Sequence, residues 1–589
     1  MSEPGDRAPK SISSPGAQAV NVVEGESVSP KNGRGEGAPP GVQGIRRVQK
    51  SFDRKLGDLE GASPPVVGGR QSRESDKRHA VTVAFEKSDE AIVPEKSAKM
   101  WVTPFESMEE RAEAEGNSAA RNAPSTQSEI SAATDMQWIR QRATQKPKEK
   151  WTNLLSHIQV PLLEKAYHSL RKRAAVGVDG VTWEAYGERL GERLHDLAGR
   201  VHRGSYHPQP VRRVEIPKGN GSLRPIGIPA LEDKIVQQAA RWLLEPIYEA
   251  EFVGFSYGFR PNRSAHDALD ALATVLHRRV DWVLDADIRS FFDTIDHGWT
   301  QKFIEHKIGD RRLVRLLMKW MKAGVMKDGE LHEVKEGTPQ GGIISPLLAN
   351  IYLHYVLDLW VQSWRQKHAV GDVYVVRYAD DFVMAFQSGM DARAMHRALP
   401  ERFAKFGLEL HPDKTRVIRF GRYARRDCER KGSGNPETFT FLGFVHIAGQ
   451  SRKGTYQLQR QTSGKKLRAS LARIKEACRR RRHLPVVDQH AWLRRVVIGH
   501  FNYYGVPSNY RALDRFHWEV TRTWHRSLQR RSQRGRWREG QRARFLTRFT
   551  LPTPRIVHPW PMERFFGRHA RGGSPVREIR PPGSVRGAG

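Results

Sequence analysis

Cysteine is nearly absent from this chain: only Cys428 and Cys478 occur among its 589 residues. Two cysteines cannot form a disulfide framework or a cysteine-rich zinc site, so the sequence fits a reducing, intracellular compartment. Long apolar runs are missing as well, because no stretch reaches the roughly 18 residues that a transmembrane helix needs. The first residues lack the basic and apolar regions of a signal peptide, so we expect no secretion. These absences together predict a cytoplasmic protein.

Acidic residues are few relative to basic ones. The chain has 65 Asp and Glu against 99 Lys and Arg, which gives a formal net charge of +34. Such a chain repels itself unless a polyanion neutralises it, and nucleic acid is the commonest partner of that kind. The alternative is the solvated surface of a merely arginine-rich protein. The distribution favours a partner, because about 33 Lys and Arg but only about 7 Asp and Glu follow from Ser451 onward.

The apolar content is low, at 38%, and it is unevenly distributed. Residues 1–130 are rich in Ser, Gly, Pro, Ala and Glu with little periodicity, so they bury too little apolar surface to offset chain entropy. We expect a disordered N-terminal extension there, with room for a short element around 81–85 or 100–105. Residues 566–589, basic and rich in Pro and Gly, are likewise expected to form a disordered tail.

Between these ends, residues 138–450 have the pattern of a packed domain of helices and strands. Segments 211–216 and 223–228 are strand-like and are joined by a Lys-Gly-Asn-Gly hairpin signal. Residues 282–288 are typical of a buried strand, and residues 451–565 are predicted to be helical and basic.

Helices are predicted where apolar residues recur at helical spacing. The stripes expected to be buried are Leu190, Leu194, Leu197 and Val201 in one helix; Leu348, Ile351, Tyr352, Tyr355 and Leu359 in a helix that Ser345-Pro346 opens; and Leu467, Leu471, Ile474 and Cys478 in the basic region after Phe444.

Carboxylates stand in two separated strand contexts. Asp287 ends the segment Val283-Leu284-Asp285-Ala286-Asp287, and Asp380-Asp381 lie between the apolar strands 374–377 and 382–386. Most Asp-Asp pairs are ordinary turn residues. Adjacent carboxylates at the apex of a buried hairpin, however, repel each other unless a cation is bound. Nucleotide polymerisation needs divalent metals held by carboxylates, which lower the pKa of the primer 3′-hydroxyl and stabilise charge on the phosphate.

Further motifs surround these carboxylates. Tyr378-Ala379-Asp380-Asp381 resembles the signature box of reverse transcriptases, Asp287–Asp293 their first carboxylate motif, and Gly337–Pro346 the motif that contacts template and nucleotide. The other matching segments are Leu223–Pro229, Gly258–Pro261, Gly407–Thr415 and Phe441–Phe444. In order and spacing, the chain resembles bacterial group II intron-encoded reverse transcriptase/maturases of the type without an endonuclease. The resemblance implies an α+β right-hand polymerase with fingers and palm at 138–450, followed by an α-helical thumb and maturase region at 451–565.

The resemblance also implies catalytic roles. Asp287 and Asp380 would hold two Mg²⁺ ions, for which Mn²⁺ could substitute, and Asp381 is the third acidic ligand and catalytic residue. Lys414 stands where related polymerases have a candidate proton donor to pyrophosphate. The Phe441–Phe444 turn corresponds to the primer grip. Asp285 and Asp293, in contrast, are expected to have structural or secondary roles.

Contacts to the incoming nucleotide are implied as well. Phe292 matches the bulky residue under the incoming sugar, where a ring would collide with a 2′-hydroxyl; the alternative is a plain core phenylalanine. Lys218 and Arg224, which flank the hairpin turn, resemble cations of the fingers that grip the triphosphate. A solvated hairpin tip would have the same composition. Gln340 and the two glycines after it would let the backbone approach nucleotide and template closely.

The C-terminal region interleaves arginine with aromatic residues. A charge run is usually a solvated face, but rings between arginines can stack on bases while arginine pairs with phosphates. The resemblance implies thumb helices along the template–primer duplex and, around Trp492–Tyr510, a maturase domain that binds intron RNA. The arginines expected to contact nucleic acid are Arg479, Arg480, Arg481, Arg482, Arg494 and Arg495. Most of the rings, which include those of Trp492, Trp518, Trp524 and Trp537, are expected to be partly core.

The favoured function therefore has two parts: binding of a group II intron RNA to promote its splicing, and copying of that RNA into cDNA at a DNA target. The expected partners are intron RNA, template–primer RNA or DNA, target DNA and deoxynucleoside triphosphates (dNTPs), with no membrane, in the bacterial cytoplasm and at the nucleoid. Because no cysteine follows Cys478, the cysteine pairs of the endonuclease found in many family members are missing, and mobility would use existing primers.

Two alternatives remain. One is a specialised reverse transcriptase of the retron, diversity-generating or phage-defence kind, against which the long basic region after Phe444 argues. The other is an RNA chaperone without polymerase activity, against which the intact Asp287, Asp380 and Asp381 argue.

Overall fold

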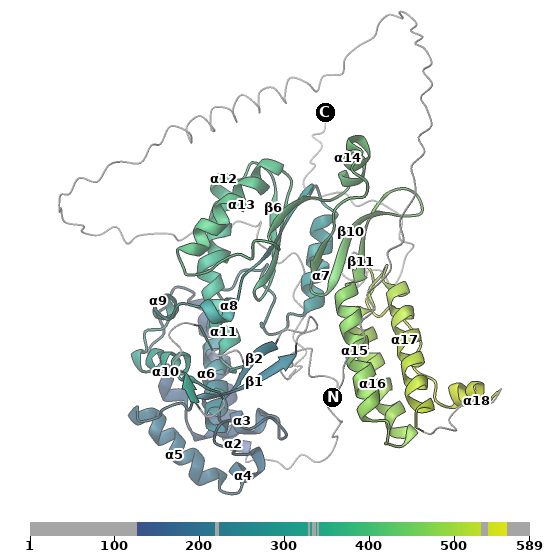
Figure 1. The fold of residues 1–589 in the computed structure, drawn as a ribbon. Coiled ribbons are helices and arrows are strands. Elements are labelled where there is room, and N and C mark those ends of the chain that lie inside the picture. The colour runs from purple at the N-terminus through teal and green to yellow at the C-terminus, as the bar shows by residue number, and fades with distance from the viewer. Residues whose placement is uncertain are drawn as a thin grey trace, which may run out of the picture. The chain divides into compact units, whose positions relative to one another are not determined.

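The computed structural model describes residues 126–217, 223–327, 330–332, 337–338, 341–531 and 540–561 (Figure 1). The predicted N-terminal extension up to residue 125 and the predicted tail at 566–589 lie outside these ranges, and so do Lys218, Gln340 and Trp537. The backbone of Arg224 is described, whereas its side chain is not.

The helices and strands have the following bounds. The described helices are α2 (Thr126–Gln145), α3 (Val160–Ser169), α4 (Trp183–Gly187), α5 (Leu190–Arg203), α6 (Leu231–Glu249), α7 (Ala265–Leu276), α8 (Phe291–Thr294), α9 (His297–Lys307), α10 (Arg311–Met321), α11 (Ser345–Leu353), α12 (Leu359–His368), α13 (Gly389–Ala404), α14 (Ala424–Lys431), α15 (Gly464–Arg480), α16 (Val486–Tyr504), α17 (Tyr510–Gln529) and α18 (Gln541–Arg548), with a 3₁₀ turn η2 (Leu154–His157) and a π-helical turn η3 (His354–Asp358). The strands are β1 (Val211–Pro217), β2 (Leu223–Ile228), β3 (Trp282–Asp287), β4 (Val325–Lys327), β5 (Glu330–His332), β6 (Val373–Tyr378), β7 (Asp381–Phe386), β8 (Arg416–Arg419), β9 (Phe439–Phe441), β10 (Phe444–Gln450) and β11 (Tyr456–Thr462).

An antiparallel sheet with strand order β6-β7-β3-β8 positions the carboxylates. The bounds of β3, β6 and β7 confirm the three strands that the sequence predicts. Leu284 in β3 and Phe382 in β7 pack on one face of the sheet in a core cluster with residues of α11 and α13. Val283 and Val383 pack on the other face with α7, and Figure 1 shows α13 and α7 on opposite sides of these strands. Helices on both faces explain why the strands are apolar on both sides.

The helix that opens at Ser345 departs from its predicted pattern in the second half. The π-helical turn η3 inserts an extra residue between α11 and α12, and such an insertion shifts the buried face by one position. As a result Asp358 is fully buried, whereas Leu359, predicted to be buried, is 39% exposed. The prediction for Leu359 is wrong for this reason. The first half of the stripe is buried as predicted.

Two predictions about the N-terminal half are confirmed. β1 and β2 form the expected antiparallel hairpin, with Val214 opposite Ile226, in a sheet of order β2-β1-β4-β5. In α5, Leu194, Leu197 and Val201 are buried along one side of the helix.

A β-hairpin precedes the basic helices. β10 and β11 pair antiparallel along their length, and β9 joins them on the other side. The sequence predicts helical structure directly after Phe444, so this prediction is wrong for residues 444–462. The strand pattern was hidden because β11 buries a charged residue: Leu458 and Thr462 face inward together with Arg460, which pairs with the buried Asp270.

The helices α15, α16 and α17 pack side by side around their own apolar cluster (Figure 1). Leu467, Ile474 and Cys478 are buried in it as predicted, with Leu471 partly buried. No helix in the described part of the chain has both the length and the apolar character needed to cross a membrane.

Candidate active site

The end of β3 and the hairpin between β6 and β7 bring the predicted carboxylates together. In the register of the antiparallel pair, Asp287 lies directly opposite Asp381, the first residue of β7. Residues opposed in this way have Cβ atoms about 4.5–5.5 Å apart. Asp380 occupies the two-residue turn with Ala379, whose φ of 57° is left-handed. Because side chains alternate along a strand, Asp285 lies on the same face of β3 as Asp287.

Burial and mutual repulsion perturb these carboxylates. Burial raises the pKa of Asp381 to about 8, and the nearby charges of Asp380, Asp285 and Asp287 add to the shift. Burial also raises the pKa of Asp285 to about 6, an effect that Arg416 opposes and Asp287 reinforces. A cation bound among these carboxylates would relieve the repulsion between them.

Lys414 lies beside Asp287. Its ammonium Nζ is 2.5 Å from Oδ2 of Asp287, although the lysine side chain is 58% exposed. The backbone maintains this arrangement, because the N–H of His411 donates to the carbonyl of Asp287 at 2.8 Å and Ile288 pairs with Leu410. The chain after Gly407 therefore runs antiparallel to the end of β3. Without a metal, the ammonium supplies positive charge at Asp287.

The turn between β9 and β10 also contacts the carboxylates. Leu442 and Gly443 have positive φ values of 48° and 79°. The N–H of Leu442 donates to Asp381, which partly offsets the rise in its pKa. On the other side of the turn, the hydroxyl of Tyr503 donates to the carbonyl of Leu442 at 2.8 Å. A Cβ at Gly443 would lie 3.1 Å from the hydroxyl of Tyr504. The sequence assigned Tyr503 to the maturase region and gave no sign of this contact.

Phe292 lies on α8, immediately after β3. It is half-buried, while its neighbour Phe291 is only 3% exposed and belongs to the core. The carbonyl of Phe292 accepts a hydrogen bond from the N–H of Thr338 at 2.8 Å. A Cβ at Gly337 would lie 2.8 Å from the same carbonyl, so this position needs glycine. The start of the Gly337–Pro346 motif is thus held against the backbone of the first carboxylate motif.

The glycine after Gln340 approaches the protein backbone closely. Gly341 has φ 122°, and a Cβ there would lie 2.4 Å from the carbonyl oxygen of Gly227 in β2. Ile343 N–H donates to the Oε1 of Gln237 at 2.9 Å. This motif therefore joins the β1–β2 hairpin to the helix α6.

These carboxylates fit a divalent metal site that substrate completes. Among the residues with described positions, no three His, Cys, Asp or Glu side chains form a preformed metal site. Mg²⁺ usually binds one or two carboxylates and takes its other ligands from substrate phosphates and water. Asp287, Asp380 and Asp381 offer such carboxylates. The raised pKa of Asp381 reflects clustered negative charge that a cation would neutralise.

The arginine run from Arg479 to Arg482 divides into two halves. The first two arginines are exposed and pair with Glu476 at 2.9 and 3.2 Å. The last two are half-buried, and the guanidinium of Arg481 lies 4.7 Å from the ring centroid of Trp492. Replacing all four arginines would therefore combine a loss of surface charge with a loss of packing.

Most aromatic rings of the C-terminal helices are core, as predicted. Trp492 is 7% exposed and Trp524 is fully buried, where its indole N–H donates to Gln489 at 3.1 Å. Arg494 and Arg495, in contrast, are exposed on α16.

Helix α17 presents an exposed basic side that the sequence did not lead us to expect. Arg511, Arg515, Trp518 and Arg522 recur at a spacing of three or four residues, so they lie on one side of the helix. We call these residues the α17 face. Trp518 is 55% exposed, and the guanidinium of Arg522 lies 4.8 Å above its ring. Helical spacing of arginines around one tryptophan was the signal that could have identified them.

An antiparallel sheet with adjacent carboxylates at a hairpin apex, opposite a third on the neighbouring strand, is the palm of a nucleotide polymerase. Comparisons with known proteins agree. The family described as reverse transcriptase (RNA-dependent DNA polymerase) matches residues 216–446. Protein YkfC of Escherichia coli (strain K12) is 36% identical over 349 residues, which cover 52% of this chain and 86% of YkfC.

Intron-encoded proteins match over the same part of the chain. The group II intron-encoded protein LtrA of Lactococcus lactis subsp. cremoris is 38% identical over 221 residues, 37% of each chain. The uncharacterized 91 kDa protein in cob intron of Schizosaccharomyces pombe is 40% identical over 202 residues, 34% of this chain and 25% of that protein. The matches thus span little more than a third of LtrA and a quarter of the yeast protein. The chain belongs to the reverse transcriptase family, together with group II intron-encoded reverse transcriptase/maturases.

Proposed function

We propose that this reverse transcriptase binds a group II intron RNA, promotes its splicing and copies it into cDNA at a DNA target. The observation that carries the polymerase half is the pairing of Asp287 with Asp381 beside Asp380 and Lys414. Similarity to LtrA supports the intron half. The substrates are a template–primer and dNTPs, and the protein works in the bacterial cytoplasm and on DNA at the nucleoid.

The proposed chemistry assigns each residue a task. Asp287, Asp380 and Asp381 hold two Mg²⁺ ions, which when bound would activate the primer 3′-hydroxyl and stabilise charge on the phosphate. The Leu442 N–H fixes the orientation of Asp381. Lys414 is placed to give a proton to the departing pyrophosphate, since its ammonium already lies at the metal-binding carboxylates.

Nucleotide binding uses the other elements around the palm. Lys218 and Arg224 at the β1–β2 hairpin grip the triphosphate through charge-assisted hydrogen bonds. Phe292 lies under the sugar and excludes a 2′-hydroxyl. Gln340 and the glycines after it line the path of nucleotide and template.

Replacing Lys414 with Met should lower the single-turnover rate of primer extension by on the order of 100-fold, the usual size of a general-acid contribution. Lys414→Arg separates proton donation from charge, because a guanidinium keeps the positive charge but holds its proton too tightly to donate it. Rapid-quench extension at saturating dNTP measures both variants. If Lys414 donates the proton, the Arg variant is as slow as the Met variant. Parental rates in both would remove Lys414 from the mechanism.

RNA binding is assigned to the exposed basic surface of the C-terminal helices, which act as thumb and maturase domain. The α17 face combines arginines for phosphates with an exposed ring on which a base can stack. Arg479, Arg480, Arg494 and Arg495 add exposed charge on α15 and α16. Arg481 and Arg482 support this surface from a half-buried position.

The combined change Arg511→Gln and Arg515→Gln should weaken binding of intron RNA and flatten its salt dependence. Each lost phosphate contact releases fewer counterions, so the slope of log K against log salt should fall by about 0.7–0.9 per contact. Trp518→Ala should instead lower affinity by about 1–3 kcal/mol with the slope unchanged, because stacking is not ionic. Filter binding from low to high salt measures both effects.

The matched control is Arg393→Gln with Arg397→Gln, which removes two exposed arginines at the same spacing from α13. This variant should keep the parental slope. An unrelated RNA of equal length provides the second comparison. Equal binding of both RNAs by the intact protein at every salt concentration would contradict the intron half of the proposal and leave the polymerase half standing.

A further inference from the structure

The turn that carries Asp380 is conformationally strained. Ala379 is 7% exposed and has φ 57°, a left-handed conformation that costs an L-residue other than glycine about 1–2 kcal/mol. A two-residue hairpin of this kind usually has glycine at its first position. Something other than local preference must therefore hold the turn in place.

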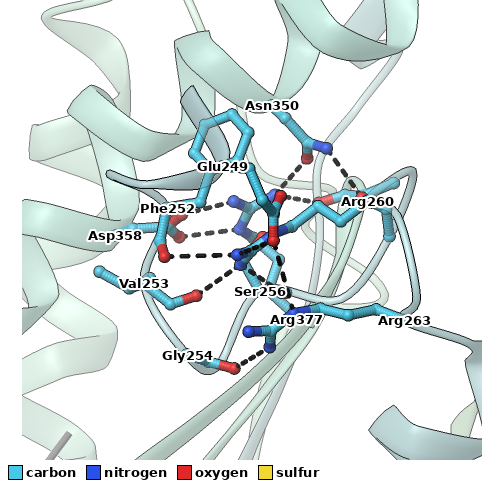
Figure 2. Close-up of polar contacts among 12 residues, drawn as sticks. Glu249, Phe252, Val253, Gly254, Ser256, Arg260, Arg263, Asn350, Asp358 and Arg377 are labelled. Atoms are coloured by element: carbon cyan, nitrogen blue, oxygen red, sulfur yellow. Dashed lines mark hydrogen bonds and ion pairs between the residues drawn. The ribbon is translucent and has the colours of Figure 1, made fainter. Parts of the chain in front are cut away.

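Arg377, two residues before the turn, is a fully buried cation in an otherwise apolar strand. Figure 2 shows its guanidinium between Asp358 and Asn350. Nε donates to Oδ1 of Asp358 at 2.8 Å, and Nη2 donates to the other carboxylate oxygen. Nη1 donates to Oδ1 of Asn350 at 3.0 Å and to the carbonyl of Ala379 at 3.1 Å. One side chain thus joins the strained turn to two residues from the helices behind the sheet.

The π-helical turn η3 is what makes this contact available. It buries Asp358 where a regular helix would bury Leu359, so the helix presents a carboxylate to the sheet at this position. Asn350, one helix earlier, accepts from Arg377 and also donates through Nδ2 to the carbonyl of Gly258 at 2.7 Å. Helix and hairpin are therefore connected by charge and by an amide bridge.

The loop at 255–258 closes the arrangement from the other side. The N–H of Arg377 donates to the carbonyl of Phe255 at 2.9 Å, and Tyr257 N–H donates to the carbonyl of Arg377 at 2.8 Å. Gly258 lies directly against the turn, since a Cβ there would be 2.2 Å from the nitrogen of Ala379. Any side chain at this position would displace the turn.

A second buried arginine holds this loop. Arg260 donates to the carbonyls of Val253 at 2.7 Å and Ser256 at 2.8 Å, and its guanidinium pairs with Glu249 at the end of α6 (Figure 2). The loop is thus fixed to α6 before it reaches the hairpin.

We propose that Asp358, Arg377 and Asn350 are positioning residues that hold the Ala379–Asp380 turn, and through it the metal-binding carboxylates, in the geometry that polymerisation needs. This inference rests on the proposed polymerase function. A buried ion pair is weak evidence for stability, because desolvation of the two charges offsets their attraction. The contact with the Ala379 carbonyl gives this pair a specific task at the hairpin apex.

Asp358→Asn, with a matched control, separates positioning from stability. Asp270→Asn breaks the other buried Arg–Asp pair, in which Arg460 Nη1 lies 2.9 Å from Oδ1 of Asp270 and both side chains are at most 3% exposed. That pair joins β11 to α7 and includes no residue of the turn. Both variants should lower Tm. Only Asp358→Asn should slow single-turnover extension, by on the order of 100-fold, the usual effect of misplacing catalytic groups by about 1 Å. It should also raise the Mg²⁺ concentration for half-maximal rate, with Kd for template–primer unchanged.

Arg377→Lys decides the matter if Asp358→Asn does not fold. A lysine keeps the positive charge against Asp358, but its single ammonium cannot serve Asp358, Asn350 and the Ala379 carbonyl together. The rate should again fall and the Mg²⁺ requirement rise. Parental rate and Mg²⁺ requirement in this variant, or equal rates in Asp358→Asn and Asp270→Asn, would overturn the proposal. Failure of the unmodified protein to extend a primer would instead contradict the polymerase function itself.

Discussion

Replacing Asp380 and Asp381 together with Ala should abolish RNA-templated primer extension and leave RNA affinity nearly intact. The change removes two of the three carboxylates proposed to bind metal, and electrostatic stabilisation of the phosphate is the main catalytic contribution in such enzymes. It removes no basic surface, so the phosphate contacts that dominate RNA affinity remain. Extension of a labelled primer and filter binding of RNA, on the same preparation, measure the two effects.

The stability of this double variant should not fall, because the substitution removes clustered negative charge. Asp381 is the residue whose pKa burial raises to about 8, with its carboxylate neighbours adding to the shift. Asp293→Ala is the matched control: it removes an exposed carboxylate of the same motif and should extend primers at the parental rate. cDNA synthesis by the double variant within about tenfold of the parent, a barrier difference of about 1.4 kcal/mol, would refute the metal assignment.

The second large effect is expected at Phe292. Phe292→Val should let the enzyme incorporate ribonucleotides, with discrimination against them reduced by about 10- to 100-fold, the range that a steric pocket contact usually provides. The structure supports this choice of residue, because Phe292 is half-buried on α8 directly after Asp287, whereas Phe291 belongs to the core. Ratios of kcat/KM for rNTP and dNTP measure the discrimination.

Phe291→Val is the control for this prediction. It shortens the neighbouring ring in the core, so it should lower stability and leave the choice of sugar unchanged. If Phe292→Val also loses stability and still rejects ribonucleotides as the parent does, Phe292 is a core residue and the sugar is selected elsewhere.

Much of the palm could be predicted from sequence because its signals are local. A hairpin is specified by alternating apolar residues and a short turn, and these lie within a few residues of each other. The strands β1, β2, β3, β6 and β7 follow from such signals. The order of the motifs along the chain also indicates the family. The roles of the site residues stay predictions until they are tested.

The pattern failed where a buried charged residue or an inserted residue broke it. β11 was missed because Arg460 faces inward, where Asp270 pairs with it. Leu359 was misplaced because η3 inserts a residue that no spacing rule anticipates. Arg377 was treated as part of an apolar strand, although a cation directly before the carboxylate turn was a visible signal.

The sequence by itself determined the family, the carboxylates and the strands that carry them, since each depends on residues adjacent in the chain. The tertiary structure decided which distant groups meet those carboxylates. Lys414 reaches Asp287 only because residues 409–414 run antiparallel to the end of β3. Tyr503 reaches the Leu442 turn only because α16 packs against it. Contacts of this kind depend on packing between segments far apart in the chain, and the spacing of residues along it does not encode them.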